Sequence, residues 1–288
     1  MPAHHSEALI VANGHNWPEL KTQVLCTEDA VSENELPLAL ERLRHILLRL
    51  EDGGPYRFVR PRNPKVLQDI LNMEDADGLD GFVLPKADSE TLPAWFKILE
   101  RHERFWLMPT LETGAVFNYS AMCRLRDELT TSPFRPRLLS LRFGALDLLG
   151  LLSLRREAER SIYESPLGFL IDQAICIFRP AGLNLTAPGY ECFDNPAGLA
   201  DELNRDVGRG LFGKTALHPA QIKPIHQAYQ VAPQDLETAR ALVDPNRSAI
   251  FRLHDRMCEK AVHTPWAKGI LKRTEIYGLK METRLDRP

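Results

Sequence analysis

The sequence predicts an α/β protein with the architecture of a (β/α)₈ TIM barrel followed by extra C-terminal helices. Short apolar runs alternate with longer amphipathic stretches, which is the pattern of parallel strands joined by helical crossovers. Eight such runs fall within the first 220 residues, and a chain of 288 residues with 44% hydrophobic content can bury one large core. We therefore expect a barrel over residues 1–220 and a helical extension over 221–288, packed on the barrel or on a neighbouring subunit.

The expected strands are short and bounded by turn residues. In chain order they are Leu9–Ala12, Gln23–Thr27, Arg57–Arg60, Gly81–Leu84, Phe105–Met108, Leu138–Arg142, Leu183–Thr186 and Thr215–Leu217. The first two are separated by only about ten residues, near the minimum for a crossover between parallel strands. The first strand–helix unit is therefore expected to be curtailed.

Helices are expected where apolar residues recur at helical spacing, several of them beginning at a proline that suits a first turn. In the barrel these are Pro37–Glu51, Lys65–Leu71, Leu92–Arg104, Phe117–Leu129, Leu148–Glu159, Pro166–Pro180 and Pro196–Val207. In the extension they are Pro219–Gln230, Pro233–Val243 and Asn246–Val262.

Composition narrows the class of protein. The net charge of −3 gives no basic surface for nucleic acid or an anionic membrane, and no apolar run is long enough to span a bilayer. Five dispersed cysteines without a CxxC pair are typical of reduced thiols, and the first residues lack the apolar core of a signal peptide. We expect a cytoplasmic protein without nucleic-acid or membrane partners.

Two carboxylates follow neighbouring strands of the predicted barrel. Glu112 comes just after the run at 105–108, and Asp147 just after the run at 138–142. Residues beyond the carboxyl ends of barrel strands line the ligand site, and paired carboxylates with open water positions suit Mg²⁺. The alternative is that each carboxylate caps the helix that follows it.

Charged residues also follow the second, third and fourth strands. Glu28 and Asp29 end the second, where one of them could instead cap a helix. Arg60 and Arg62 share a face of the third if it is extended; guanidinium groups bind carboxylates at both oxygens, but two surface arginines would show the same pattern. Lys86 follows the fourth and could bind an anion or pair with Glu28.

Taken in order, these motifs resemble the citrate lyase β-subunit-like family of the aldolase/citrate lyase superfamily. The sequence reads V-x-x-x-E-D-A-V from Val24, then V-R, L-P-K, E-T, G-x-x-D-L and finally G-K-x-x-x-H-P-x-Q from Gly213. The likeness runs from about Val24 to Ala267. The sequence departs from the family pattern at Cys26 and at His254-Asp255, and its V-R-P-R-N-P together with M-C-E and a following P-W-A resembles a divergent branch of this family.

The resemblance implies roles for the barrel residues. Glu112 and Asp147 would ligate one Mg²⁺, with Glu28 and Asp29 holding metal-bound waters and contributing to substrate binding. Arg60 would bind a substrate carboxylate, with Arg62 as its competitor for that role. Further residues are implied to support the site: Lys86 in the polar network, and His218 and Gln221 in ordering the turn after the last strand.

The resemblance also implies a general base from the C-terminal tail, supplied across the interface of a homotrimer. The family's D-G-x-M-x-D is H-D-R-M-C-E here, which puts Glu259 at the position of the base. Asp255 and His263 are lesser candidates. A solvated helix residue is the alternative interpretation of Glu259.

The implied activity is Mg²⁺-dependent carbon–carbon bond cleavage or formation, of lyase or aldolase type, through an enolate. The substrate would be a small oxo- or hydroxy-acid or its CoA thioester. One alternative is a malyl-CoA-type lyase, synthase or thioesterase on the same site. Another is a barrel without turnover that serves as a binding or assembly component.

Overall fold

The computed structural model describes residues 1–281. The chain divides into two compact units, one spanning Met1–Ile222 and the other beginning at Lys223. Each unit is described here by itself.

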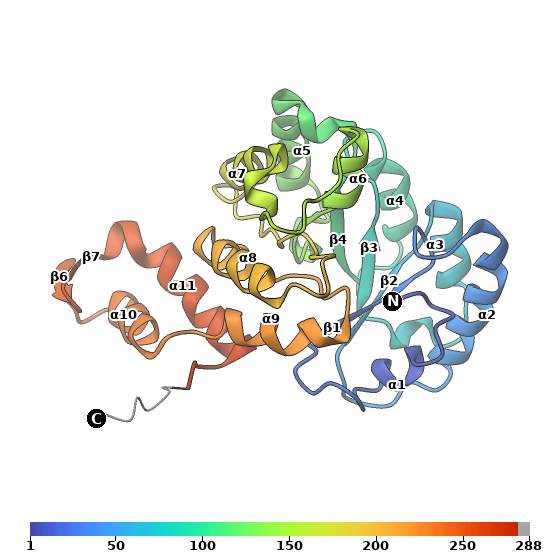
Figure 1. Ribbon diagram of the computed structural model, residues 1–288, viewed down its shortest axis with the longest axis horizontal. Coiled ribbons are helices and arrows are strands. Elements are labelled where there is room, and N and C mark those ends of the chain that lie inside the picture. Colours follow the sequence, from blue (N-terminus) through green and yellow to red (C-terminus); the bar gives the residue numbers. More distant parts are fainter. Residues whose placement is uncertain (282–288) are drawn as a thin grey trace. The chain divides into compact units, whose positions relative to one another are not determined.

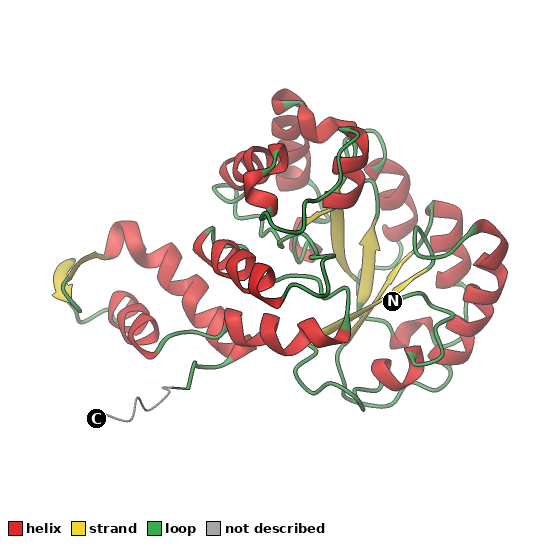
Figure 2. Ribbon diagram, in the orientation of Figure 1, coloured by secondary structure: helices red, strands yellow, loops and turns green. Residues whose placement is uncertain are grey.

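A curled parallel sheet forms the centre of the first unit. Its strands are β1 (Thr22–Cys26), β2 (Tyr56–Arg60), β3 (Gly81–Leu84), β4 (Trp106–Leu111) and β5 (Arg142–Phe143). They pair in chain order, each parallel to the next, and Figure 2 shows them in yellow with helices around them. The predicted α/β class and four of these strands are confirmed, whereas the strand expected at Leu138–Arg142 overlaps β5 only at Arg142.

Single parallel bridges continue the sheet where two further strands are expected. Leu185 pairs with Leu141, and Ala187 pairs with Lys214. Pro188 follows Ala187 directly and has no N–H to donate, so a longer ladder cannot form there. The expected strands at 183–186 and 215–217 are thus reduced to bridges among the described residues.

The expected strand at Leu9–Ala12 is wrong. These residues lie in helix α1 (Ala8–Ala12), which buries Ala8, Val11 and Ala12 on one face. A short apolar run does not distinguish a strand from a buried helical turn. The place beside β1 is taken by Met1–Ala3, where the Cys26 N–H donates to the Met1 carbonyl at 2.8 Å.

Helices cover the outer face of the sheet (Figure 1). They are α2 (Leu36–Leu47), α3 (Pro64–Leu71), α4 (Leu92–Leu99), α5 (Tyr119–Thr131), α6 (Ala145–Leu151), α7 (Pro166–Phe178) and α8 (Pro196–Gly208). Short 3₁₀ turns lie between them: η1 (Glu33–Glu35), η2 (Ala76–Gly78), η3 (Gly114–Phe117), η4 (Arg135–Arg137), η5 (Ile162–Glu164) and η6 (Pro219–Gln221). Asn side chains cap α3, α5 and α8, and a serine side chain caps α7, each accepting a main-chain N–H.

The two faces of each strand have different partners. Val59, Leu107 and Leu111 belong to the large core between sheet and helices. Phe58, Val83 and Met108 form a small apolar cluster of their own. Phe58 and Met108 mark the interior face of the sheet. Because side chains alternate along a strand, the residues two and four positions after them lie on the same face.

The second unit contains a helical hairpin and a β-hairpin. Helix α9 (Ile222–Tyr229) spans the division between the units, and α10 (Pro233–Val243) and α11 (Lys260–Tyr277) follow. Val231, Leu242 and Ile270 are among its buried apolar residues. Among residues 1–281, no helix combines the length and the apolar composition that a membrane crossing requires.

The expected helix over Asn246–Val262 is wrong. Strands β6 (Ile250–Leu253) and β7 (Arg256–Glu259) pair antiparallel there. The two residues between them, His254 and Asp255, both have left-handed φ values of 48° and 58°. A two-residue turn with positive φ at both positions matches the twist of a hairpin, so this turn sets the local structure.

Candidate functional site

Strand alternation places four polar side chains inside the curled sheet. Arg60 lies two positions after Phe58, and Thr110 and Glu112 lie two and four positions after Met108. Arg142 lies between Leu141 and Phe143, which both pack outward in the large core. These side chains therefore meet at the carboxyl end of the strands, where ligands bind in parallel α/β folds.

Glu28 is the anchor of an ion-pair network at this end. Its buried carboxylate contacts the Arg60 guanidinium and the Lys86 ammonium, each at 3.1 Å. Asp29 lies beside it, 3.5 Å from Lys86 and 3.8 Å from Arg60. The expected pairing of Lys86 with Glu28 is present.

Lys86 also connects this network to Glu112. Its main-chain N–H donates to Glu112 Oε1 at 2.8 Å, and its carbonyl accepts from the Thr91 hydroxyl at 2.7 Å. Lys86 has a left-handed φ of 51°, which is uncommon for a residue with a side chain. The two main-chain hydrogen bonds hold this conformation and so fix the Glu112 carboxylate.

Glu112 and Asp147 face the same cavity. Glu112 is 3% exposed, and burial raises its pKa to about 7, with a further contribution from the charge of Asp147. Burial and the nearby Asp29 also raise the pKa of Asp147, which lies in the first turn of α6. A Cβ on Gly144 would lie only 2.2 Å from Glu112 Oε2, so glycine leaves the space that this carboxylate occupies.

This donor set fits a hard divalent cation. Within residues 1–281, no three His, Cys, Asp or Glu side chains are grouped closely enough to surround a metal ion. Mg²⁺ is usually held by one or two carboxylates, and water and substrate complete its coordination. The pKa values of Glu112 and Asp147 are both raised, and a bound cation would stabilise the ionised form of these two carboxyl groups.

The cavity has a volume of about 110 Å³ and a lining of polar and apolar residues in equal part. That is room for roughly four water-sized groups, which suits part of a small organic acid. Its lining includes the side chains of Arg60, Thr110, Glu112, Arg142, Asp147, Thr186 and Thr215.

Two of the expected site residues are not part of this network: Arg62 adjoins Glu28 but binds main-chain carbonyls, and Glu259 belongs to the second unit. Arg62 donates to the main-chain carbonyls of Glu28, at 3.3 Å, and of Val31, and so fastens the loop after β1. Glu259 ends β7 in the second unit, where its main-chain N–H donates to His263 Nδ1 at 3.0 Å. The structure therefore brings Glu28, Asp29, Arg60, Lys86, Glu112 and Asp147 together but not Arg62.

Residues at the end of the first unit order the turn after Lys214. Gln221 accepts the Leu217 N–H at 2.9 Å and donates to the Tyr190 carbonyl at 2.7 Å. His218 Nδ1 accepts the Ala220 N–H at 3.3 Å. These contacts agree with the turn-ordering role expected for His218 and Gln221.

A fully buried ionic cluster supports the same side of the barrel. The Lys214 ammonium lies 2.9 Å from Glu202 and 3.0 Å from Asp206. Arg156 contacts the other oxygen of Glu202, and all these side chains are almost completely buried. The cluster fixes Lys214, and with it the position of the neighbouring Thr215.

Two functional candidates were missed in the sequence, Thr110 and Arg142. The sequence contained a signal for both, since each is a polar residue within a short buried strand. Thr110 is two positions before Glu112, and Arg142 interrupts the apolar pair Leu141 and Phe143.

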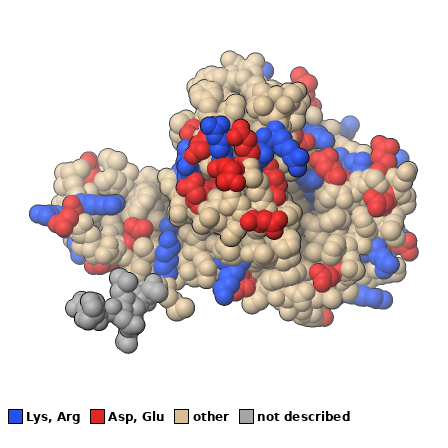
Figure 3. Space-filling model, in the orientation of Figure 1, with Lys and Arg blue, Asp and Glu red and all other residues tan. Residues whose placement is uncertain are grey.

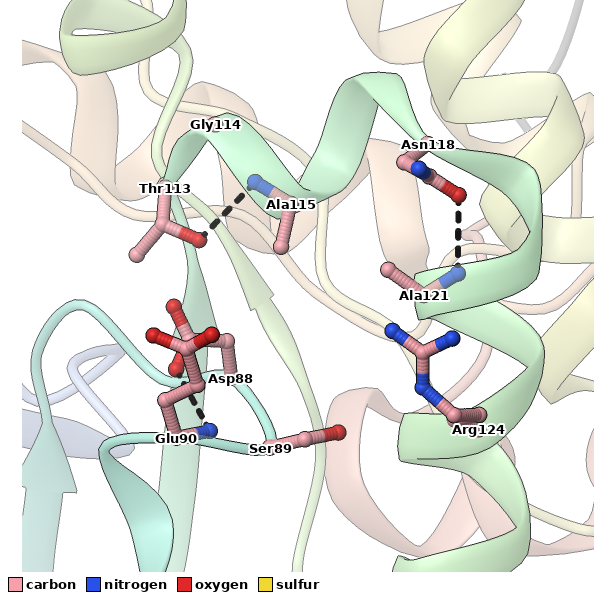
Figure 4. Close-up of a pocket in the computed structure, with 9 residues that line it drawn as sticks. All are labelled: Asp88, Ser89, Glu90, Thr113, Gly114, Ala115, Asn118, Ala121 and Arg124. Carbon is pink, nitrogen blue, oxygen red and sulfur yellow. Dashed lines mark hydrogen bonds between the residues drawn. The ribbon is translucent and has the colours of Figure 1, made fainter.

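A second cavity of about 340 Å³ lies between the loop after β3 and the start of α5 (Figure 4). Three of its polar side chains, Asp88, Thr113 and Asn118, accept main-chain N–H groups two or three residues further on. Arg124 extends into this space from α5. Because these side-chain oxygens already cap local turns, we assign no catalytic role to this cavity.

The charged surface is mixed in sign. On the face shown in Figure 3, lysine and arginine side chains are interspersed with aspartate and glutamate and form no continuous basic patch.

Comparison with known proteins shows the family of this chain. The family model for C–C bond lyases of the TIM-barrel fold matches residues 1–279. The chain belongs to this family of C–C bond lyases. The expected likeness to citrate lyase β subunits is confirmed, because the β subunit of citrate lyase from Escherichia coli K12 is 26% identical over 152 residues, 51% of this chain and 49% of that protein.

Other relatives of this C–C bond lyase differ in their named activity. The (3S)-malyl-CoA thioesterase of Cereibacter sphaeroides is 26% identical over 215 residues, 74% of this chain and 70% of that protein. The solved structure of CitE from Mycobacterium tuberculosis with magnesium, acetoacetate and coenzyme A has a TM-score of 0.64 at 19% identity, covering 96% of each chain. A citrate lyase from Burkholderia xenovorans has a TM-score of 0.69 at 18% identity, covering 90% of this chain and 85% of that one.

Proposed function

We propose that this protein is a Mg²⁺-dependent carbon–carbon bond lyase of aldolase type, acting on a small oxo- or hydroxy-acid or its CoA thioester. The observation that carries the proposal is the pair Glu112 and Asp147, which line one cavity together with Arg60 and Arg142. Membership of the C–C bond lyase family, and a relative solved with magnesium, support it.

Glu112 and Asp147 would hold the metal ion through their carboxylates. When bound, Mg²⁺ acts as a Lewis acid toward a substrate oxygen. Glu28 and Asp29 lie beside this pair and, already paired with Arg60 and Lys86, would orient water and substrate around it.

The chain's own cations would stabilise developing negative charge. In the cleavage direction, a base removes the proton of the substrate hydroxyl, and the hydroxyl carbon becomes a carbonyl as its bond to the neighbouring carbon breaks. The electron pair of that bond passes to the other fragment, which holds the original carbonyl group, as an enolate. Contact with Glu28 and Asp29 raises the pKa of Lys86 despite an opposing effect of burial, so Lys86 is protonated at neutral pH. Fixed positive charge close to a developing enolate lowers the barrier to its formation.

Glu259 is proposed as the base. Its carboxylate would accept the hydroxyl proton, supplied from a neighbouring subunit of a homotrimer. Support for this role comes from its position in the motif H-D-R-M-C-E.

A thioesterase of the malyl-CoA type is the second candidate, favoured by the Cereibacter sphaeroides relative. There, water would attack the thioester carbonyl, the carbon–sulfur bond would break, and free CoA would leave as the thiol. The third candidate is a barrel without turnover that serves as a binding or assembly component.

Deuterium exchange separates these candidates without knowledge of the full substrate. The protein is incubated with Mg²⁺ and acetyl-CoA or pyruvate in D₂O; methyl exchange is followed by NMR and free thiol by a colorimetric reagent. A lyase exchanges methyl protons without releasing thiol, and the exchange is lost in Asp147→Ala but kept in the exposed control Asp69→Ala. Thiol release without exchange would support the thioesterase, and the absence of both reactions would contradict turnover.

A further inference from the structure

Arg142 is a cation without a counter-ion inside the barrel. Among the described residues, its hydrogen-bond partner is the Thr215 hydroxyl, which accepts from Nη2 at 2.8 Å. Within residues 1–281, no carboxylate lies within ion-pair distance of it. A guanidinium has five N–H donors, so most of the donors of Arg142 have no protein acceptor.

Burial makes this arrangement costly for the free protein. Removal from water lowers the pKa of Arg142 to about 10; the charge of Arg60 adds to this shift, and that of Glu112, beyond ion-pair distance, partly opposes it. A desolvated charge is stable in a protein when it is paired and hydrogen-bonded. The cavity that Arg142 lines is the place where an anion could supply that pairing.

Thr110 supplies an independent observation at the same wall. It is the register partner of Arg142 in the β4–β5 ladder, so the two side chains stand next to each other on the interior face. Thr110 is 4% exposed, and its hydroxyl has no hydrogen-bond partner although it lines the cavity. Buried hydroxyl groups are normally bonded, and one that is not has room for a ligand atom.

The other arginine of the cavity is already engaged. Arg60 contacts Glu28 at 3.1 Å and donates from Nε to the Cys26 sulfur at 3.3 Å. The two guanidinium groups are thus not equivalent. Arg60 completes the network around Glu28, whereas Arg142 faces the cavity with free donors.

We infer that Arg142 and Thr110 form an anion subsite for a second carboxylate of the substrate, distinct from the end that meets Glu112 and Asp147. This assignment rests on the proposed function and deepens it. The substrate class is then a short oxo- or hydroxy-acid with a carboxylate at each end. Arg142 is in this account a specificity-determining residue, and Thr215 positions it.

Malate and lactate test this inference, because both are stable hydroxy-acids and they differ by the second carboxylate. Binding to the Mg²⁺-loaded protein is measured by calorimetry. A charge-assisted hydrogen bond in a buried site predicts that the wild type binds malate roughly 10- to 100-fold more tightly than lactate. Arg142→Met is expected to remove that difference and leave lactate binding unchanged, while Arg142→Lys restores part of it.

Thr110→Val is a second variant that does not depend on the arginine. It removes the unpartnered hydroxyl at nearly constant volume, so thermal stability should stay equal or rise slightly. Malate affinity should nevertheless fall several-fold, which a purely structural role for Thr110 does not predict. Arg101→Met, at an exposed position after α4, is the control for loss of an arginine.

Equal loss of malate and lactate binding in Arg142→Met would overturn the inference, because Arg142 would then serve the carboxylate that both ligands share. Unchanged malate binding in both variants, or a wild type that binds neither acid, would overturn it as well. Malate binding that needs Arg142 but is indifferent to Mg²⁺ would support the subsite and contradict the proposed function.

Discussion

Replacing Glu112 with glutamine should stabilise the metal-free protein while it removes the metal site. In the folded chain, burial raises the pKa of Glu112 from 4.5 to about 7. A raised pKa means that the folded protein favours the protonated form of this carboxyl group. The stability that this preference contributes is complete below pH 4.5 and is lost as the pH rises through 7.

The size of the effect follows from the pKa shift. A shift of about 2.5 units corresponds to about 3 kcal/mol, because each unit is worth 1.36 kcal/mol. A glutamine side chain stays neutral and keeps an oxygen to accept the Lys86 N–H. In EDTA at pH 8, Glu112→Gln should therefore be up to about 3 kcal/mol more stable than the wild type, and roughly 5–10 °C higher in Tm.

Urea and thermal denaturation at pH 5, 6, 7 and 8 in EDTA measure this difference. The wild type should lose stability across this range relative to Glu112→Gln, and the two should converge near pH 5. Glu100→Gln, at an exposed position at the end of α4, should follow the wild type. The same pH dependence in Glu112→Gln and the wild type would refute the reasoning, as would a variant less stable at pH 8.

Two further substitutions test other parts of the account. Lys214→Met leaves the buried Asp206 without its cation and Glu202 with Arg156 alone, and the free energy of unfolding from urea titration should fall by about 3–5 kcal/mol; a loss below about 1 kcal/mol would contradict the importance of this cluster. Glu259→Gln should lower turnover at least roughly 100-fold with little effect on Mg²⁺ affinity, whereas the hairpin-turn control Asp255→Asn should not; unchanged turnover in Glu259→Gln would reject it as the base.

The sequence was sufficient to predict that these charged side chains gather at one end of the sheet, because each of them ends or follows a predicted parallel strand. Arg60 ends the third predicted strand and Glu112 follows the fifth, and in the structure they lie two and four positions after Phe58 and Met108 on the interior face. Glu28 and Lys86 were predicted in the same way from the ends of their strands. The ion pair between them shows that the carboxyl ends of β1 and β3, with β2 between them, lie at the same edge of the sheet.

The errors have physical causes that a single sequence does not reveal. The apolar run Leu9–Ala12 fits either a strand or a buried helical turn, and no flanking residue distinguishes the two. Met1–Ala3 pairs with β1 and so excludes Leu9–Ala12 from that edge of the sheet. The hairpin at His254-Asp255 depends on two left-handed residues that carry side chains, where glycine or asparagine would be the usual signal. Arg62 shares a face with Arg60 only if the strand continues past Pro61, but β2 ends at Arg60.

Calorimetric titration of Mg²⁺ into the wild type and Asp147→Ala tests the central claim most directly. The account predicts one Mg²⁺ site per chain in the wild type, binding at least roughly tenfold weaker in Asp147→Ala, and wild-type affinity in Asp69→Ala. No Mg²⁺ binding by the wild type, or equal binding by Asp147→Ala, would contradict the proposal of a metal-dependent lyase at this site.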